Sequence, residues 1–220
     1  MKSLVNYVVR NRRYALPKNW RIGAKAIYRR LSKSGILFAA DELPMASLRP
    51  SHKVARIIEL VRPRTVVDIG CGTGSSMRQF LETGVTAVGV EASRAAIRAS
   101  RDPNLINRHD LRRSLDLGRR FELVWCFEVA EHIHPRYVET FVDTLCRHSD
   151  VVALSAAHPG QGGEGHFNEQ PQSYWVQKFE KRGYHLHAEW TAQMKAPDEL
   201  FSENMMVFCN RPQLPRVASV

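Results

Sequence analysis

Three features are missing from this 220-residue sequence: cysteine pairs at CxxC spacing, internal repeats and long apolar runs. The four cysteines, at positions 71, 126, 146 and 209, therefore give no support to a zinc knuckle or a thioredoxin-type motif. The longest apolar runs have the length of a strand, which excludes a membrane-spanning helix of roughly 20 residues. The first residues also lack the apolar core of a secretory signal, so we expect a reducing, cytoplasmic setting.

Acidic residues are also missing from the first 40 positions, where ten Lys and Arg lie. Residues 41–220 hold 22 bases and 22 acids, so this leader carries the whole net charge of +10. This basic segment has three possible interpretations: it forms helices that cover a substrate site, it is an organellar targeting peptide, or it binds an anionic partner. That partner could be nucleic acid, a phosphorylated substrate or a membrane surface. Tyr7, Tyr14, Trp20 and Tyr28 lie among the bases, which keeps RNA stacking open.

After the leader, strand-sized apolar runs alternate with helical segments. This alternation is typical of a parallel sheet with both faces covered. The sequence therefore predicts an α/β fold with a mostly parallel, doubly wound, seven-stranded sheet and an antiparallel last strand. We predict strands at 65–69, 85–90, 105–108, 121–127, 151–155, 184–190 and 205–209, and helices at 51–61, 75–83, 93–101, 135–148 and 170–182.

The sharpest motif is a glycine-rich turn at the end of the first predicted strand. The stretch at 68–74 reads DIGCGTG, where the strand gives way to a helix. Glycine suits a tight turn whose backbone approaches a ligand closely. The dinucleotide-binding pattern requires a glycine where this chain has Ser75, and the Walker pattern requires a lysine that is absent. The pattern is thus GxGxG, with a carboxylate two residues ahead of it.

This turn resembles motif I of class I S-adenosylmethionine-dependent methyltransferases, which have a Rossmann-like fold. The resemblance implies S-adenosyl-L-methionine as the cofactor. It also implies that Asp68 orients the methionine end, that Glu91 holds the ribose hydroxyls and that Asp110 meets the adenine amino group. The other positions that it assigns to the cofactor are Gly70, Cys71, Gly72, Gly74, Leu111 and Phe127.

The resemblance covers about residues 52–209 and divides the chain into three parts. Residues 1–50 are expected to form a basic helical N-terminal extension. Residues 51–210 are expected to form the methyltransferase domain, and residues 211–220 a C-terminal tail.

A second constellation lies in the stretch FELVWCFEVAEHI at 121–133, which looks like the fourth motif of the same family. Its spacing is similar to the ExxEH metal ligands of small-RNA 2′-O-methyltransferases and ubiquinone-pathway O-methyltransferases. The similarity implies that Mg²⁺ or Mn²⁺ is held by Glu128, Glu131, His132 and His166, and that the last three are catalytic. Without a metal, His132, His158 or His166 would serve as a general base.

The segment GQGGEGHFNEQPQSYW at 160–175 is dense in glycine and polar groups, and we expect His166 and Asn168 to be functional. Together with the preceding SAA string, it resembles predicted methyltransferases of bacterial polysaccharide and secondary-metabolite clusters. The resemblance implies O-methylation of a hydroxyl on a small molecule or sugar. Two alternatives stay open: an RNA 2′-O-methyltransferase whose basic segment binds nucleic acid, and a binding module that lacks catalysis.

Overall fold

In the computed structural model of the protein, the described residues are 51–163, 165–195 and 202–210. The predicted N-terminal extension and C-terminal tail, at 1–50 and 211–220, lie outside the described residues. Among the helices that are described, none combines the length and the apolar character needed to cross a bilayer.

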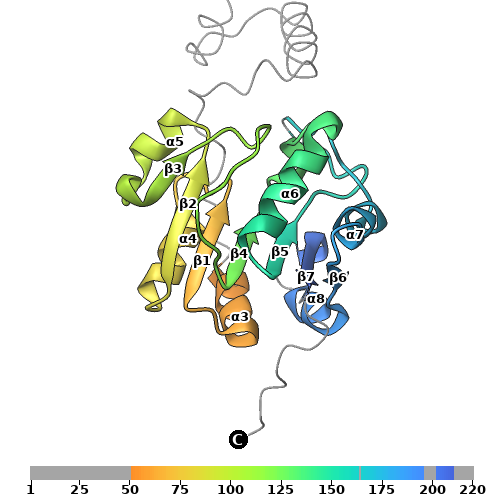
Figure 1. Cartoon of the computed structure of the whole chain (residues 1–220), viewed down its shortest axis with the longest axis horizontal. Coiled ribbons are helices and arrows are strands. Elements are labelled where there is room, and N and C mark those ends of the chain that lie inside the picture. The colour runs from red at the N-terminus through yellow and green to blue at the C-terminus, as the bar shows by residue number, and fades with distance from the viewer. Residues whose placement is uncertain (1–50, 164, 196–201, 211–220) are drawn as a thin grey trace, which may run out of the picture. The chain divides into compact units, whose positions relative to one another are not determined.

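Seven strands form one sheet in the order β3-β2-β1-β4-β5-β7-β6 (Figure 1). Strands β1 to β5 run parallel, whereas β7 pairs antiparallel with both β5 and β6. The strands are β1 (Thr65–Ile69), β2 (Thr86–Glu91), β3 (Ile106–Arg108), β4 (Leu123–Cys126), β5 (Val151–Ser155), β6 (His185–Leu186) and β7 (Met205–Cys209). The helices are α3 (Ser51–Val61), α4 (Ser75–Glu82), α5 (Arg94–Ala99), α6 (Val138–His148), α7 (Gln172–Glu180) and α8 (Ala188–Met194). Short 3₁₀ turns are η1 (Pro103–Leu105), η2 (Ala130–His132), η3 (Pro135–Tyr137) and η4 (Ser202–Asn204).

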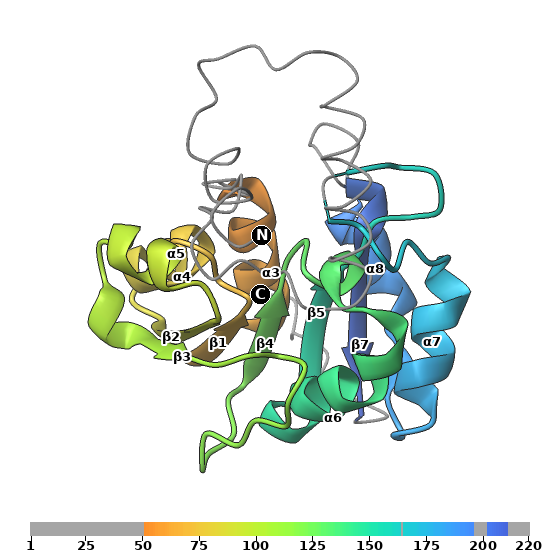
Figure 2. The same ribbon diagram turned by 90° about the horizontal axis from the view of Figure 1, so that it is seen from above.

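Side chains of the central strands alternate between two hydrophobic clusters, one on each face of the sheet. Val66 and Trp125 pack with α3 and α4, whereas Val67 and Cys126 pack with α6 and α7. Figure 2 shows the two helical layers on opposite sides of the strands. Because both faces are covered, strands β4, β5 and β7 consist almost entirely of apolar residues, which explains why their positions were predictable from sequence.

The predicted fold class is confirmed: the sheet is seven-stranded and mostly parallel, with antiparallel strands at one side. The predicted strand at 184–190 is wrong beyond Leu186, because helix α8 follows it. The His187 side chain accepts a hydrogen bond from the Trp190 backbone N–H and stacks on its ring, so it caps α8. Thr191 and Met194, one helical turn apart, are buried, and this burial favours the helix over an extended strand.

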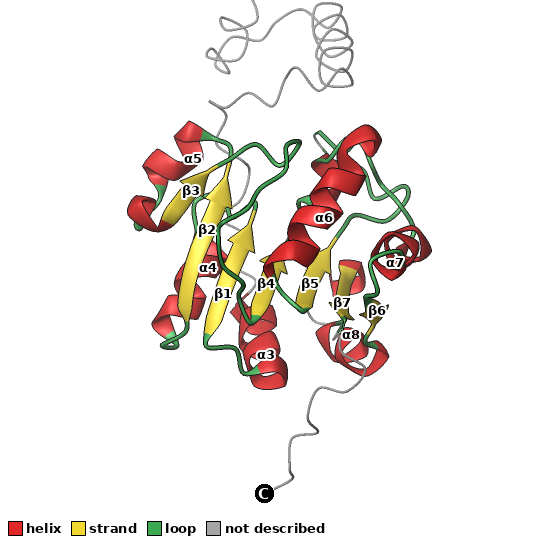
Figure 3. Cartoon of the chain, in the orientation of Figure 1, coloured by secondary structure: helices red, strands yellow, loops and turns green. Residues whose placement is uncertain are grey.

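The parallel strands all end at one edge of the sheet, which Figure 3 shows at the arrowheads of β1, β2, β4 and β5. The chain order reverses between β1 and β4, since β2 and β3 lie on one side of β1 and β5 on the other. Loops diverge at such a switch point and leave space for a ligand beyond the carboxyl ends of the strands. The glycine-rich turn follows β1 and the EVAEH segment follows β4, so both predicted motifs flank this point.

Candidate functional site

The glycine-rich turn adopts a conformation that requires glycine. Gly70, Gly72 and Gly74 have φ values of +78°, +57° and +80°, in the left-handed region. A Cβ atom on Gly70 would lie 2.5 Å from the Cγ2 atom of Val129, in the loop after β4. The loops after β1 and β4 are therefore in contact at Gly70, and this contact leaves no room for a side chain there.

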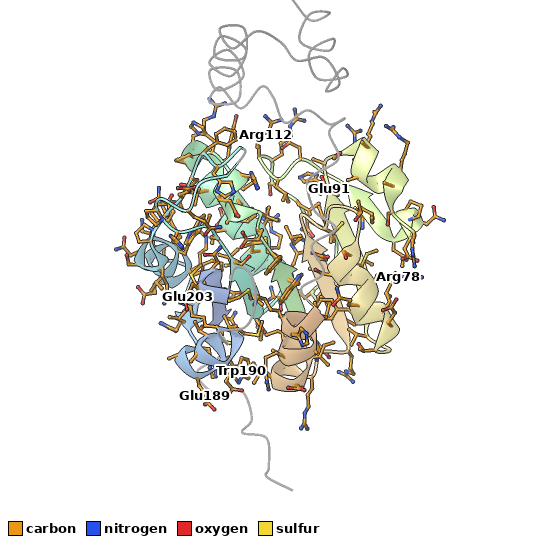
Figure 4. All side chains as sticks on the ribbon, turned by 180° about the vertical axis from the view of Figure 1, so that it is seen from behind. Arg78, Glu91, Arg112, Glu189, Trp190 and Glu203 are labelled. Atoms are coloured by element: carbon orange, nitrogen blue, oxygen red, sulfur yellow. The ribbon has the colours of Figure 1, made fainter. Side chains whose placement is uncertain are left out.

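Two carboxylates accept hydrogen bonds from the turn and from the helix that follows it. The Asp68 side chain is buried and accepts a hydrogen bond of 3.1 Å from the Met77 N–H, in the first turn of α4. Burial raises the pKa of Asp68 to about 7. The two Glu91 carboxylate oxygens accept hydrogen bonds from the N–H groups of Gly72, at 2.9 Å, and Ser93, at 2.7 Å. Glu91 lies at the sheet edge where the parallel strands end (Figure 4), so its remaining lone pairs are placed to accept further hydrogen bonds there.

The remaining cofactor candidates occupy different surroundings. The Asp110 carboxylate forms a bidentate ion pair with Arg112, with a shortest contact of 2.6 Å. Burial acts in the opposite direction, but the hydrogen bonds from Arg112 lower the pKa of Asp110. Leu111 and Cys71 are buried, and Phe127 stacks on Trp125 with a ring-centroid separation of 5.7 Å. Asp110 thus already has a cationic partner, which sequence reasoning did not anticipate.

We expect Glu91→Ala to weaken donor binding at least about 100-fold, because a hydrogen bond to a charged group contributes about 1.5–3 kcal/mol and two ribose hydroxyls would each lose one. Calorimetric titration with S-adenosylhomocysteine measures the change. Glu180→Ala, which removes an exposed carboxylate at the end of α7, is the control. Unchanged affinity in Glu91→Ala would refute the ribose assignment.

Glu128 stands at the end of β4 in a strained conformation. Its φ of +55° is rare for a residue with a side chain. Its N–H donates to the Ser155 Oγ at 2.6 Å, and its Oε1 accepts a hydrogen bond of 3.1 Å from the Asn204 side-chain amide. These contacts direct Glu128 toward β5 and η4.

Glu131 is a buried carboxyl with a strongly raised pKa. It is fully buried in η2, and neither of its carboxylate oxygens accepts a hydrogen bond from any residue in the described ranges. Burial, followed by the nearby charge of Glu128 and a side-chain hydrogen bond shared with it, raises the pKa of Glu131 to about 9. A buried carboxylate that accepts no hydrogen bond costs free energy when it is ionised, and such groups concentrate at functional sites.

Two histidines flank this carboxyl. The His132 Nδ1 lies 3.0 Å from the Gly165 carbonyl oxygen, so Nδ1 carries the proton and Nε2 carries the lone pair of the neutral ring. Burial lowers the pKa of His132 to about 4, which keeps the ring neutral at physiological pH. The ring of His166 packs edge-to-face against it, with centroids 5.0 Å apart. Glu131, His132 and His166 each present one ligand atom within 4.8 Å of the others.

The structure brings together three of the four residues for which a metal role was predicted. Glu128 does not belong to the group of ligand atoms within that distance, because its carboxylate is held by Asn204. His158 is exposed and lies outside the same group. Asn168 is buried, and its Nδ2 has no hydrogen-bond acceptor among the described residues. The contact of Asn204 with Glu128 joins residues 76 positions apart, and no signal in a single sequence reveals it.

The chain is similar to known methyltransferases in sequence. A family model described as a methyltransferase domain matches residues 45–155, half of the chain. A curated relative, the dTDP-3-amino-3,6-dideoxy-alpha-D-glucopyranose N,N-dimethyltransferase of Streptomyces fradiae, is 32% identical over 82 residues. This match covers 36% of the present chain and 32% of the relative, so it spans about a third of either protein.

Solved structures share the fold. The sugar N-methyltransferase KedS8 from a Streptoalloteichus species matches with a TM-score of 0.58 at 18% identity, over 90% of this chain and 95% of that one. The small RNA methyltransferase HEN1 matches with a TM-score of 0.57 at 15% identity, over 81% of this chain and 27% of that one. Both structures therefore support the same arrangement of strands and helices around the switch point.

Proposed function

Since this chain belongs to the S-adenosylmethionine-dependent methyltransferases, we propose that it methylates a hydroxyl oxygen of a small molecule or sugar with the help of a divalent cation. The observation that carries the proposal is the buried Glu131 carboxyl, whose oxygens accept no hydrogen bond from the described residues, with two imidazoles beside it. The glycine turn after β1 and Glu91 would hold the donor. The cluster of Glu131, His132 and His166 would hold the acceptor on the other side of the switch point, after β4.

The three residues fit a divalent cation by the chemistry of their donor atoms. Two imidazole nitrogens and one carboxylate oxygen suit Mn²⁺ better than Mg²⁺, which prefers oxygen ligands. A cation would also supply the charge partner that Glu131 lacks among the described residues. When bound, it would orient two neighbouring acceptor hydroxyls and lower the pKa of the one that is methylated.

His132 is better suited to coordination than to proton transfer. A general base works best with a pKa near the operating pH, and burial lowers the pKa of His132 to about 4. The hydrogen bond from Nδ1 to Gly165 O directs the lone pair to Nε2, the arrangement of a metal-binding histidine with an outer-shell acceptor. The chain's remaining task is alignment, because methyl transfer is an in-line displacement that depends on positioning.

Two other acceptors each have an observation in their favour. The Streptomyces fradiae relative is an N,N-dimethyltransferase of an amino sugar, which favours an amine acceptor. The structural similarity to HEN1 and the basic leader favour the 2′-hydroxyl of RNA. The cluster of Glu131, His132 and His166 favours a hydroxyl, because an amine needs no cation to lower its pKa.

An acceptor panel tests the proposal. The full chain is incubated with labelled S-adenosylmethionine and a neutral sugar with vicinal hydroxyls, an amino sugar or a short RNA, with EDTA or with Mn²⁺. We expect methylation of the neutral sugar, which EDTA abolishes and Mn²⁺ restores. Metal-independent methylation of the amino sugar would contradict the proposal, and preference for RNA would favour the nucleic-acid alternative.

We expect His166→Ala to lower turnover at least about 100-fold, since it removes one of three ligands of a cation that contributes several kcal/mol. Affinity for S-adenosylhomocysteine should stay within about twofold, because the contacts of the His166 side chain are with His132 and Glu169 rather than with the glycine turn. His158→Ala, an exposed histidine near the start of the same loop, is the matched control. A loss of donor binding in His166→Ala would show that the loop contacts the donor instead.

A further inference from the structure

Glu169 organises the loop that joins β5 to α7. Its Oε1 accepts hydrogen bonds from the Gly162 N–H, at 2.7 Å, and from His166 Nδ1, at 3.0 Å. Its Oε2 accepts a hydrogen bond of 3.0 Å from the Gly160 N–H. One carboxylate therefore binds the backbone of the glycine-rich part of the loop and the imidazole of His166 at the same time.

The contact with Glu169 determines which ring nitrogen of His166 carries the proton. An ionised carboxylate only accepts hydrogen bonds, so Nδ1 must be the protonated nitrogen. In the neutral ring the lone pair then lies on Nε2, the form in which imidazole binds a metal. The hydrogen bond of the His166 ring to a described residue is made by Nδ1, and none is made by Nε2. The side chains of His166 and Glu169 are only 12% and 20% exposed, so water competes little for their contact.

The loop backbone leaves a space fitted to the His166 ring. A Cβ atom on Gly163 would lie 2.3 Å from His166 Nε2, so a larger residue there would displace the ring. The N–H groups of Phe167 and Asn168 both donate to the Glu131 carbonyl oxygen, at 2.9 and 3.0 Å. These bonds hold the end of the loop beside η2. The His166 ring can still rotate, and its hydrogen bond to Glu169 restricts that rotation.

We propose that Glu169 is a positioning residue that holds His166 in the Nδ1-protonated tautomer and so presents Nε2 to the acceptor site. The consequence for metal affinity rests on the function proposed above, whereas the tautomer itself does not. Carboxylate partners of this kind, outside the ligand set, typically change metal affinity or activity 10–100-fold when they are removed.

The test is the histidine tautomer in the full-length, metal-free protein, read from long-range ¹⁵N–¹H correlation spectra. The pH is set at 8.5, well above the ordinary imidazole pKa of about 6.5. His166→Gln assigns the signal. We expect His166 to be Nδ1-protonated in the wild type and to shift toward the Nε2-protonated form in Glu169→Gln, because the glutamine amide can donate to Nδ1.

Glu180→Gln is the matched control, and it should leave the tautomer unchanged. A wild-type His166 protonated on Nε2 would overturn the proposal without any variant, as would an unchanged tautomer in a folded Glu169→Gln. Affinity for S-adenosylhomocysteine within about twofold of the wild type shows that the variant is folded.

Titration with Mn²⁺ separates this proposal from the proposed function. We expect the Mn²⁺ affinity of Glu169→Gln to be about 10–100-fold weaker than that of the wild type and of Glu180→Gln. A tautomer shift in a protein whose wild type does not bind Mn²⁺ would support the positioning role of Glu169 and refute the cation. Wild-type Mn²⁺ binding with an unchanged tautomer in Glu169→Gln would support the cation and refute the positioning role of Glu169.

Discussion

We expect Glu131→Gln to abolish saturable Mn²⁺ binding and to lower turnover at least about 100-fold, while the metal-free protein becomes more stable at neutral and alkaline pH. The losses of Mn²⁺ binding and of turnover follow from removal of the only anionic ligand in the cluster of Glu131, His132 and His166. The gain in stability follows from the pKa of Glu131, which burial raises to about 9. Calorimetry with protein preloaded with S-adenosylhomocysteine, activity assays and thermal melts measure the three quantities.

The pH dependence has a definite sign. In the unfolded chain Glu131 loses its proton near its ordinary pKa of 4.5, whereas the folded chain retains it to about pH 9. Wild-type stability contributed by this proton is therefore complete below pH 4.5 and declines as the pH rises to about 9. Glutamine does not titrate, so the variant should have the higher melting temperature at pH 8. Each kcal/mol gained in the free energy of unfolding raises the melting temperature by about 2–4 °C.

Two comparisons make the Glu131 prediction specific. Glu128→Gln should keep saturable Mn²⁺ binding, because the carboxylate of Glu128 is held by Asn204 and lies outside the cluster. The wild type should bind Mn²⁺ more tightly as the pH rises from 6 to 8, since the cation must displace a proton from Glu131. Full activity of Glu131→Gln in EDTA would refute the cation and leave the histidines as walls of the acceptor pocket.

We expect Gly70→Ala to destabilise the protein and to weaken donor binding more than tenfold. The left-handed φ of +78° costs a residue with a Cβ atom about 1–2 kcal/mol. The added Cβ would also lie 2.5 Å from Val129, so the loops after β1 and β4 must move apart. The Gly70 N–H donates to the Val90 carbonyl oxygen, and this bond would be disturbed as well. Thermal melts and titration with S-adenosylhomocysteine measure both effects.

Gly84→Ala is a control that separates the two costs. Gly84 has a φ of +83°, nearly that of Gly70, but nothing lies within 4 Å of a Cβ atom placed there. It should therefore lower the melting temperature by roughly 2–8 °C through backbone strain alone, without effect on the donor. A Gly70→Ala variant that resembles Gly84→Ala in both measurements would show that Val129 moves aside freely.

The central part of the sheet could be predicted from local sequence patterns. Strands β1 and β5 have their predicted bounds, because a strand covered on both faces is mostly apolar and stands out as a short apolar run. The segment after Leu186 was predicted wrongly, since β6 is a two-residue edge strand and the apolar residues that follow it belong to helix α8. Edge elements bury one side only, so their periodicity is weak and tertiary contacts decide their form.

The sequence by itself determined the glycine-rich turn, because a tight turn with left-handed φ values is readily adopted by glycine and costly for other residues. It also determined that carboxylates and imidazoles gather at one edge of the sheet, since parallel strands end there together. Only the tertiary structure decided which of them meet: His166 reaches His132 while His158 stays exposed, and Glu128 turns to Asn204 while Glu131 remains buried. The physical reason is that loop hydrogen bonds such as those of Glu169 and Ser155 set side-chain directions, and their partners are distant or irregularly spaced in the chain.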